Sequence, residues 1–471
     1  MSLHEPTSAA FKANSVAALA NVNLQSALRT SRGGFVDKRL KAVDAVPEFE
    51  ALREQAKALK DHVLANLGHY LEQYEAKVIA AGGHVHWAET AEDAQKIVLD
   101  LCRKAGAKAV NKGKTMISEE CGINDFLAAN GITPVETDLG EYIIQLRGET
   151  PSHIIAPAVH VTEAEVAAEF RKAHTHLPKD RDLSGLDTLL LEARSVLREK
   201  YFQAEVGITG ANMLVAETGH SIIVTNEGNG DLSQSLPKVH IVLASIEKIV
   251  PTLEDSSTIL RLLARSATGQ EISVYTTFSK GPRRADDPDG PLEYHVVLLD
   301  NGRTNMLGTE FQDMLRCIRC GACMNHCPVY QAVGGHAYGW VYPGPMGAVL
   351  TPSLIGVEAG GQLPNASTFC GRCESVCPMK IPLPKMMRHW REREFEKKLT
   401  PGSVRWGLGF WAFFVKRPRL YRLSTGLGMR ILRLLGRGSA KRLPFAGGWT
   451  EYRDFPLPQG KTFMAQIRGR K

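Results

Sequence analysis

The stretch CIRCGACMNHCP runs from Cys317 to Pro328, and the shorter stretch CGRCESVCP runs from Cys370 to Pro378. Together they hold seven of the nine cysteines in this chain of 471 residues. The first run has the C-x2-C-x2-C-x3-C-P spacing that holds a cubane iron–sulfur cluster. Three thiolates of such a loop cover one face of a cluster, and the fourth cysteine, before the proline, reaches a neighbouring cluster. The spacing therefore predicts bound iron–sulfur clusters and a role in carrying electrons.

The second run lacks its first cysteine. Aligned on the Cys-Pro end, the missing position falls at Ser367. Swapped ligation then predicts these two ligand sets: Cys317, Cys320, Cys323 and Cys377 for cluster 1, and Cys327, Cys370 and Cys373 for cluster 2. Cluster 1 is expected to be 4Fe–4S. Cluster 2 is either a three-iron 3Fe–4S cluster or a 4Fe–4S cluster whose fourth ligand is Ser367 or solvent, and the sequence leaves this choice open.

Zinc and disulfides are the competing explanations for the cysteines. A structural zinc site needs four ligands, whereas seven are present and both runs end in proline. Disulfides are disfavoured because no secretory segment is visible and dense C-x2-C runs in a reduced compartment are typical of metal sites. Cys102 and Cys121 lie far from the runs, and we expect them to be ordinary buried thiols.

The charge is unevenly distributed along the chain. Residues 400–471 carry 15 Lys and Arg but 2 Asp and Glu, whereas the whole chain has a net charge of +7. This basic tail is predicted to be a solvated extension, a helix at an anionic membrane surface or a docking surface for an acidic partner. Nucleic acid is disfavoured because no recognition fold accompanies the charge. We expect a cytoplasmic protein, with peripheral attachment at the inner face of the membrane left open, because no signal peptide or spanning run is visible.

The pattern of apolar residues upstream of the cysteines predicts an α/β domain on a largely parallel sheet. Residues 48–83 have helical periodicity and are followed by alternating strands and helices, and strands dominate later. Two helices open with capping signals, Thr90 with Asp93 and Thr162 with Glu165. The predicted strands are 84–88, 107–113, 132–138, 212–218, 220–226, 238–245, 271–279 and 293–300.

Four parts follow from these patterns. Residues 1–47 are expected to be loosely structured, and residues 48–301 to form the α/β domain with its N-terminal helices. Residues 302–398 are expected to form a small α-helical ferredoxin-type domain with two clusters. Within it, the Gly- and Pro-rich segment 336–366 is predicted to be irregular. Residues 399–471 form the basic tail.

Several segments resemble the lactate utilisation protein B family, the iron–sulfur subunit of a bacterial lactate oxidation system. They are KGKTMISEECGIN (112–124), ETDLGEYIIQL (136–146), PSHIIAPAVH (151–160), GITGANMLVAETGHSIIVTNEGNGD (207–231), SIEKIVP (245–251) and the two cysteine runs. The resemblance covers about residues 50–400. It implies an α/β domain like those of sugar-phosphate isomerases and coenzyme A transferases, fused to an α-helical ferredoxin-type domain. It also implies a part in oxidising L-lactate to pyruvate together with two companion proteins.

The α/β domain offers few chemical signals of its own. It has no dinucleotide-binding or P-loop fingerprint, so its glycine-rich turns are either anion sites or simply tight turns. The acidic candidates are either nucleophiles or ordinary solvated or capping groups. The lysine candidates either bind an anion or are solvated, and the histidine candidates are either catalytic or ordinary core or surface residues. These candidates are Glu217, Glu227, Lys112, Lys114, His153 and His160.

Three functions remain in competition. The first is an electron-transfer subunit of a complex that oxidises L-lactate to pyruvate and delivers electrons to the respiratory chain. The second is an enzyme whose α/β domain itself acts on a hydroxy acid or transfers a group. The third is an iron–sulfur regulatory or scaffold protein. Swapped ligation favours the first, because it places two clusters side by side as in a wire.

Overall fold

The computed structural model describes residues 5–434, 438–443, 447–450, 453–458 and 461–468. The chain divides between Arg393 and Glu394 into two units, which are described separately. The first unit contains the two larger sheets and the cysteines.

A six-stranded parallel sheet is the frame of the first unit, with strand order β1-β10-β7-β4-β2-β3. Its strands are bounded as follows: β1 His84–Ala88, β2 Ala109–Gly113, β3 Thr133–Glu136, β4 Val206–Thr209, β7 Val239–Ser245 and β10 Glu293–Leu299. Successive side chains of a strand point to opposite faces. On β7, Ile241 and Leu243 accordingly pack in one core cluster, and Val242 and Ala244 in another.

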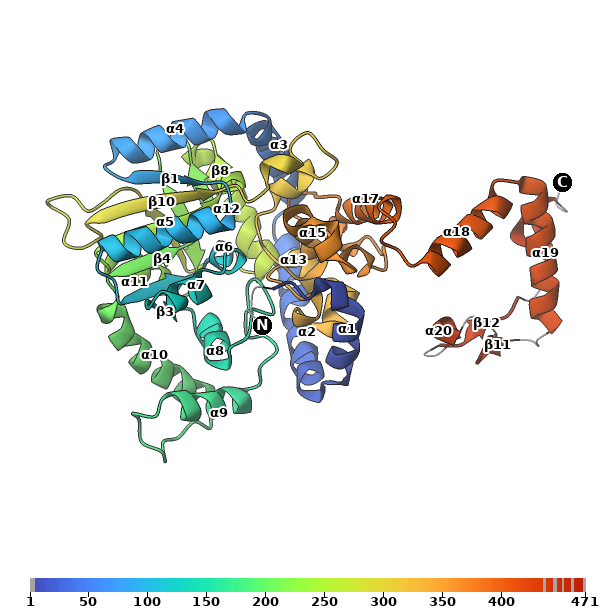
Figure 1. The fold of residues 1–471 in the computed structure, drawn as a ribbon, viewed down its shortest axis with the longest axis horizontal. Helices are drawn as coiled ribbons and strands as arrows, with labels where there is room; N and C mark the ends of the chain where they lie inside the picture. Colours follow the sequence, from blue (N-terminus) through green and yellow to red (C-terminus); the bar gives the residue numbers. More distant parts are fainter. Residues whose placement is uncertain (1–4, 435–437, 444–446, 451–452, 459–460, 469–471) are drawn as a thin grey trace. The chain divides into compact units, whose positions relative to one another are not determined.

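Helices cover both faces of this sheet, as parallel sheets require. The core of one face includes α5 and α7, and the core of the other includes α4 (Figure 1). The helices up to β7 are α3 Phe49–Ala65, α4 Leu67–Ala80, α5 Ala91–Lys104, α6 Met116–Glu120, α7 Ile123–Ala129, α8 Leu139–Arg147, α9 Glu163–Ala173, α10 Leu186–Gln203 and α11 Asn229–Ser235. Both predicted capping boxes are present, at Thr90 and at Thr162.

A second, four-stranded sheet has the order β8-β5-β6-β9 and joins the α/β part to the cysteine region. Side chains of β5 and β6 share a core cluster with helix α12 and with residues around the cysteines. The elements are β5 Met213–Val215, β6 Ser221–Thr225, η2 Ile246–Lys248, β8 Ile249–Val250, α12 Leu253–Ala267 and β9 Tyr275–Ser279. The α/β part and the cysteine region therefore have a common hydrophobic core.

Between residues 302 and 382 the cysteine region contains helices and turns, most of the helices being short. They are η3 Thr304–Met306, η4 Gln312–Arg316, α13 Ala322–Asn325, α14 Pro328–Val333, η5 His336–Tyr338, α15 Gly344–Gly360, η6 Leu363–Asn365 and α16 Arg372–Ser375, followed by α17 Leu383–Glu396. The fold class predicted from the sequence, an α/β domain with a small α-helical ferredoxin-type domain, is confirmed.

The prediction that residues 1–47 are loosely structured is wrong for the residues described. Residues 8–44 form η1 Ser8–Ala10, α1 Phe11–Ala20 and α2 Val22–Asp44, which lie beside α13 to α15 (Figure 1). Thr7 N–H donates to Gly339 O, and Gln25 Nε2 donates to Ala332 O. The apolar stripe of these helices is weak, and the cysteine region, distant in sequence, supplies many of the contacts that hold them.

The prediction that segment 336–366 is irregular is also wrong in part. Helix α15 occupies Gly344–Gly360, although it contains Pro352 and is kinked at Gly356, where φ is 86°. Its side chains are buried on several sides, as those of Met346, Val349 and Leu350 show. Glycine and proline predicted a loop here, but burial in the shared core holds the helix.

The second unit contains α18 Gly402–Val415, α19 Pro418–Leu434, β11 Ser439–Ala440, α20 Gly447–Thr450, β12 Phe455–Pro456 and α21 Phe463–Arg468. Helices α18 and α19 pack on each other, and β11 pairs with β12. Within the part of the chain that is described, no helix has both the length and the apolar character needed to cross a membrane.

Candidate iron–sulfur site

Four cysteines from the two runs meet at one small cavity. Cys317 follows η4, Cys320 and Cys323 flank the turn into α13, and Cys377 follows α16, and all four line the same cavity. The remainder of the lining is mostly apolar and includes Met314, Met346, Met379 and Leu383. Four thiols from the two runs thus converge on an apolar pocket. Four thiolates are the donor set of a cubane iron–sulfur cluster, so these residues fit such a cluster.

The other three cysteines form a second group. Cys327 caps the N-terminus of α14, while Cys370 and Cys373 flank the turn into α16. Cys327 and Cys373 are close enough to each other and to Cys370 for their charges to interact. Cys323 of the first group also interacts with Cys373 of the second, so the groups are neighbours. The structure thus brings together the two sets that the spacing predicts.

The two turns before α13 and α16 have the same backbone geometry. Gly321 and Gly371 have φ of 73° and 78°, in the left-handed region that favours glycine. A side chain on Gly321 would in addition come within 3.3 Å of His153 and Ile155. The glycines therefore let each loop turn sharply between two cysteines. The absence of a side chain on Gly321 also leaves room for the loop that contains His153 and Ile155.

Burial is the main influence on the protonation of the Cys320 and Cys373 thiols. It raises the pKa of Cys320 to about 12, with a further contribution from the nearby Cys377. It also raises the pKa of Cys373 to about 12, here with Cys327 as the next contribution. Since iron binds thiolates, loading of the site must release protons, and cluster assembly is favoured by higher pH.

Two arginines from the N-terminal helices hold the backbone of the second run. Arg39 donates to Val376 O at 2.9 Å, and Arg53 donates to Cys377 O at 2.7 Å and to Ser375 O at 3.1 Å. These hydrogen bonds from charged donors fix the carbonyls around the ligand Cys-Pro end. Sequence reasoning missed both arginines, because nothing in their local pattern links them to cysteines more than 300 residues away.

A buried ionic network joins the α/β part to the cysteine region. Arg303 makes a two-pronged contact with Glu120, with Nη1 at 2.9 Å from Oε1 and Nη2 at 2.7 Å from Oε2. Tyr342 donates to Glu120 at 2.6 Å, and Arg303 also pairs with Glu247 at 2.9 Å. Burial opposes ionisation of Glu247, but Arg303 and Arg319 lower its pKa to about 2.

Comparison with known protein families agrees with this division. Residues 71–299 match the LUD domain, residues 313–381 match the 4Fe-4S dicluster domain, and residues 398–471 match the C-terminal region of lactate utilisation protein B. The second match spans both cysteine runs. Iron–sulfur clusters are therefore the group that this site holds.

Curated relatives match over nearly the whole chain. Lactate utilization protein B of Bacillus licheniformis is 39% identical over 96% of this chain and 95% of its own length. The protein of the same name in Bacillus subtilis strain 168 is 39% identical over the same shares. The uncharacterized electron transport protein YkgF of Escherichia coli K12 is 40% identical over 91% of this chain and 90% of its own. The chain belongs to the lactate utilisation protein B family.

One solved structure is also similar to this protein. It is a DUF162 family protein from Deinococcus radiodurans, 14% identical, with a TM-score of 0.28 over 50% of this chain and 98% of that one. A score this low supports no argument about the fold or the site.

The acidic and basic candidates from the sequence have structural partners. Lys112 is buried between Glu119 and Glu136, and Lys114 pairs with Asp138 and, at 3.2 Å, with the exposed Glu227. Glu217 accepts from the first N–H of α12, that of Leu253, at 3.3 Å. Glu217 is thus a capping group, and Glu227 is the partner of an ion pair with Lys114. Cys102 and Cys121 are buried away from both cysteine groups.

The two histidine candidates hold loops in place. His153 is buried, with Nε2 2.9 Å from Asn325 Oδ1, and its Nδ1 accepts from Ile155 and Ala156. His153 therefore fixes the loop that packs on Gly321. Burial lowers the pKa of His153 to about 4, which keeps its ring neutral.

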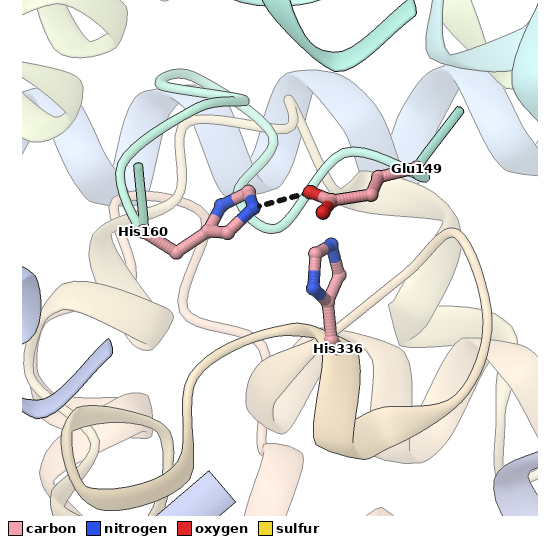
Figure 2. A group of neighbouring side chains, drawn as sticks. All are labelled: Glu149, His160 and His336. Carbon is pink, nitrogen blue, oxygen red and sulfur yellow. Dashed lines mark hydrogen bonds and ion pairs between the residues drawn. The ribbon is translucent and has the colours of Figure 1, made fainter. Parts of the chain in front are cut away.

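His160 belongs to a cluster with Glu149 and His336 (Figure 2). His160 Nε2 lies 2.8 Å from Glu149, and Arg147 donates to the other oxygen of Glu149 at 2.8 Å. Two imidazoles and a carboxylate are a donor set that zinc and iron accept. However, His336 Nε2 already donates to Thr150 O, and Arg147 neutralises the carboxylate. We therefore interpret this cluster as a structural contact that holds two segments of the chain together.

Proposed function

We propose that this protein is the electron-carrying subunit of a complex that oxidises L-lactate to pyruvate and delivers the electrons to the respiratory chain. The observation that carries the proposal is the pair of adjacent cysteine groups, which lie in one unit with the α/β domain. Cubane clusters, when bound, take up and release single electrons. The names of the relatives, lactate utilization protein B and an electron transport protein, support the same role.

The chemistry on lactate belongs to a companion subunit in this proposal. Oxidation of lactate to pyruvate removes two electrons and two protons, so a group that separates the pair is required, commonly a flavin or a metal centre. The α/β domain has no dinucleotide fingerprint for such a group. The companion lactate-utilisation subunits supply it.

The protein holds two clusters, and each cysteine run supplies ligands to both of them. Cys317, Cys320, Cys323 and Cys377 hold the first, a 4Fe–4S cluster, and their common cavity supports this assignment. Cys327, Cys370 and Cys373 hold the second. Swapped ligation fixes the clusters side by side, which suits relay of electrons better than sensing.

Ser367 is the fourth ligand of the second cluster, which is then also 4Fe–4S. The support is a local repeat of the first loop. Arg319 N–H points at Cys317 Sγ at 3.5 Å, and Phe369 N–H donates to Ser367 Oγ at 3.1 Å. Arg319 and Phe369 also share an unusual positive φ, 59° and 54°. Ser367 Oγ thus occupies, within its loop, the place that Cys317 Sγ occupies within the first.

The basic tail attaches the protein to an anionic membrane surface. Helix α19 has exposed Leu423, Leu427 and Ile431, and α18 exposes Trp406, Phe410 and Trp411. Residues 402–434 contain seven Arg and Lys and no Asp or Glu. Aromatic and leucine side chains combined with arginines are typical of helices that lie in the membrane interface. Membrane attachment would bring the clusters near a respiratory acceptor.

The decisive test of the function is anaerobic mixing with substrate. The reconstituted protein is mixed with L-lactate, alone and together with its companion subunits, while the visible absorbance of the clusters is followed. We expect bleaching only when the companions are present. Bleaching by L-lactate without any companion would overturn the proposal and favour an enzyme acting on the hydroxy acid itself. Failure to bleach even with all companions would favour the regulatory or scaffold function.

A further inference from the structure

A second, larger cavity lies at the carboxyl edge of the main sheet. It has a volume of about 350 Å³ and is lined by residues that follow β2, β4 and β7 of this sheet and by residues that follow β6 of the second sheet. Examples are Lys114, Gly210, Asn226 and Lys248. Parallel α/β sheets bind their ligands at this edge, and the volume is in the range of small-molecule sites. Nothing in the electron-carrying role requires such a cavity.

Lys248 is a charged group of this cavity that the fold leaves without a partner, as it also leaves one carboxylate oxygen of Glu141. It lies in η2, directly after β7, and the residue is 7% exposed. Among the residues described, its ammonium makes no hydrogen bond or ion pair, although a buried ammonium normally requires both. The neighbouring carboxylate of Glu247 is instead engaged by Arg303 and Arg319.

Apart from the Cys317 thiol, which interacts with both Lys248 and Arg319, the side chains around Lys248 leave an excess of positive charge at this end of the cavity. Arg319 also lines it and is 3.3 Å from Glu247. At the other end, Lys114 is matched by Asp138 and Glu227. Burial, with the charges of Glu136 and Asp138, raises the pKa of the lining residue Glu141 well above its usual range, which favours its uncharged form.

The rest of the lining is largely apolar. Met116, Ile154, Ile155 and Leu263 contribute to it, together with small residues of α12. Arg319 and Ile154 line the cluster cavity as well, so the two cavities share a wall. An occupant at this end would lie next to the ligands of the first cluster.

From these observations we infer that the cavity is a binding site for a small organic carboxylate, whose carboxylate group pairs with Lys248 and Arg319. Lysine and arginine together are the cations that recognise carboxylates, and the apolar wall suits the remainder of a short organic acid. The inference rests on the proposed function only in the choice of probes below, because an acid of the lactate class is then the natural candidate.

The test is isothermal titration calorimetry of the anaerobically reconstituted full chain with L-lactate and with pyruvate. L-lactamide serves as the uncharged probe of the same shape, and inorganic phosphate as the inorganic anion. We expect saturable binding of at least one carboxylate and no binding of L-lactamide. Lys248→Met removes the charge but keeps an unbranched side chain, one atom shorter, and should weaken binding about tenfold or more. Lys248→Arg should retain binding, and the exposed Lys280→Met is the matched control.

Other outcomes would overturn the inference. Carboxylate binding that survives Lys248→Met would place the site elsewhere, and equal binding of phosphate would indicate a general anion site. No binding of either carboxylate at millimolar concentration would leave Lys248 as a counter-charge for the first cluster. If Lys248→Met does not fold, the comparison of L-lactate, pyruvate and L-lactamide on the unmodified protein decides. Iron content and companion-dependent bleaching of the same preparation test the proposed function separately.

Discussion

At the scale of single residues, Ser367 is the proposed fourth ligand of the second cluster, and its replacement tests the type of that cluster. Because its oxygen takes the place of a cysteine sulfur in the loop, Ser367→Cys should give a second cluster with four thiolates and an unchanged iron content. Ser367→Ala should convert the second cluster to a three-iron form with its own electron paramagnetic resonance signal in the oxidised protein. The exposed neighbour Thr368→Ala is the control. An alanine variant with unchanged iron and spectrum would assign the fourth position to solvent.

Lys60 gives a second residue-scale prediction. It donates to the carbonyl groups of Glu247 and Ile249, and burial lowers its pKa to about 7. Glu247 opposes this shift, and Lys248 adds to it. The ordinary lysine pKa of about 10.4 applies to the unfolded chain. Between these two values the unfolded chain binds more protons, so the free energy of unfolding should rise with pH.

For one group this rise is at most about 1.4 kcal/mol per pH unit. Lys60→Met should remove it and flatten the profile, as measured by denaturant unfolding at several pH values above 7. Lys57→Met, on the same helix but more exposed, should keep the slope. If Lys60→Met left the slope unchanged, another group would be responsible.

At the scale of elements, α19 is predicted to bind anionic lipid. Each arginine close to an anionic surface is worth about 1 kcal/mol, so replacing Arg430 and Arg433 by glutamine should weaken binding roughly tenfold to thirtyfold. Cosedimentation with vesicles containing phosphatidylserine measures this, and pure phosphatidylcholine vesicles are the control. Salt should weaken the binding as well. Binding to companion subunits without binding to either vesicle would make the tail a protein-docking surface instead.

Elements with local signals could be predicted from the sequence, and others could not. Helices α5 and α9 carry complete capping boxes, and β7 and β10 are dense apolar runs. Helices α1 and α2 carry neither signal strongly. Contacts with the distant cysteine region stabilise them, and such contacts cannot be read from the local sequence. Helix α15 could not be predicted because glycine and proline disfavour a helix. The unfavourable helix propensity of these residues is offset by burial of the helix in the core.

The candidate site shows the same division. The spacing of the cysteines is local information, and it predicts which thiols meet. The partners of that site come from other parts of the chain. Arg39, Arg303 and Lys248 acquire their positions through the packing of α2, β10 and β7, so no local pattern could reveal them.

At the scale of the whole molecule, Arg303 couples the sheet domain to the cysteine region. Arg303→Met would leave Glu120 and Glu247 buried without their main counter-charge, and removal of one partner of a buried pair typically costs about 3–5 kcal/mol. We expect a loss of this size in the free energy of unfolding and faster release of iron to a chelator. Arg284→Met, which removes an exposed pair with Asp287, should change neither. Equal stability of the two variants would show that the network does not join the parts.

The central claim is that this chain holds two neighbouring clusters that relay electrons. Electron paramagnetic resonance of the fully reduced protein tests it most directly, because two paramagnetic clusters at about 10 Å, the distance expected for swapped ligation, broaden each other's signals. We predict an interacting two-cluster spectrum that integrates to two spins. A single sharp signal that integrates to one spin, or no iron-based signal at all, would contradict it.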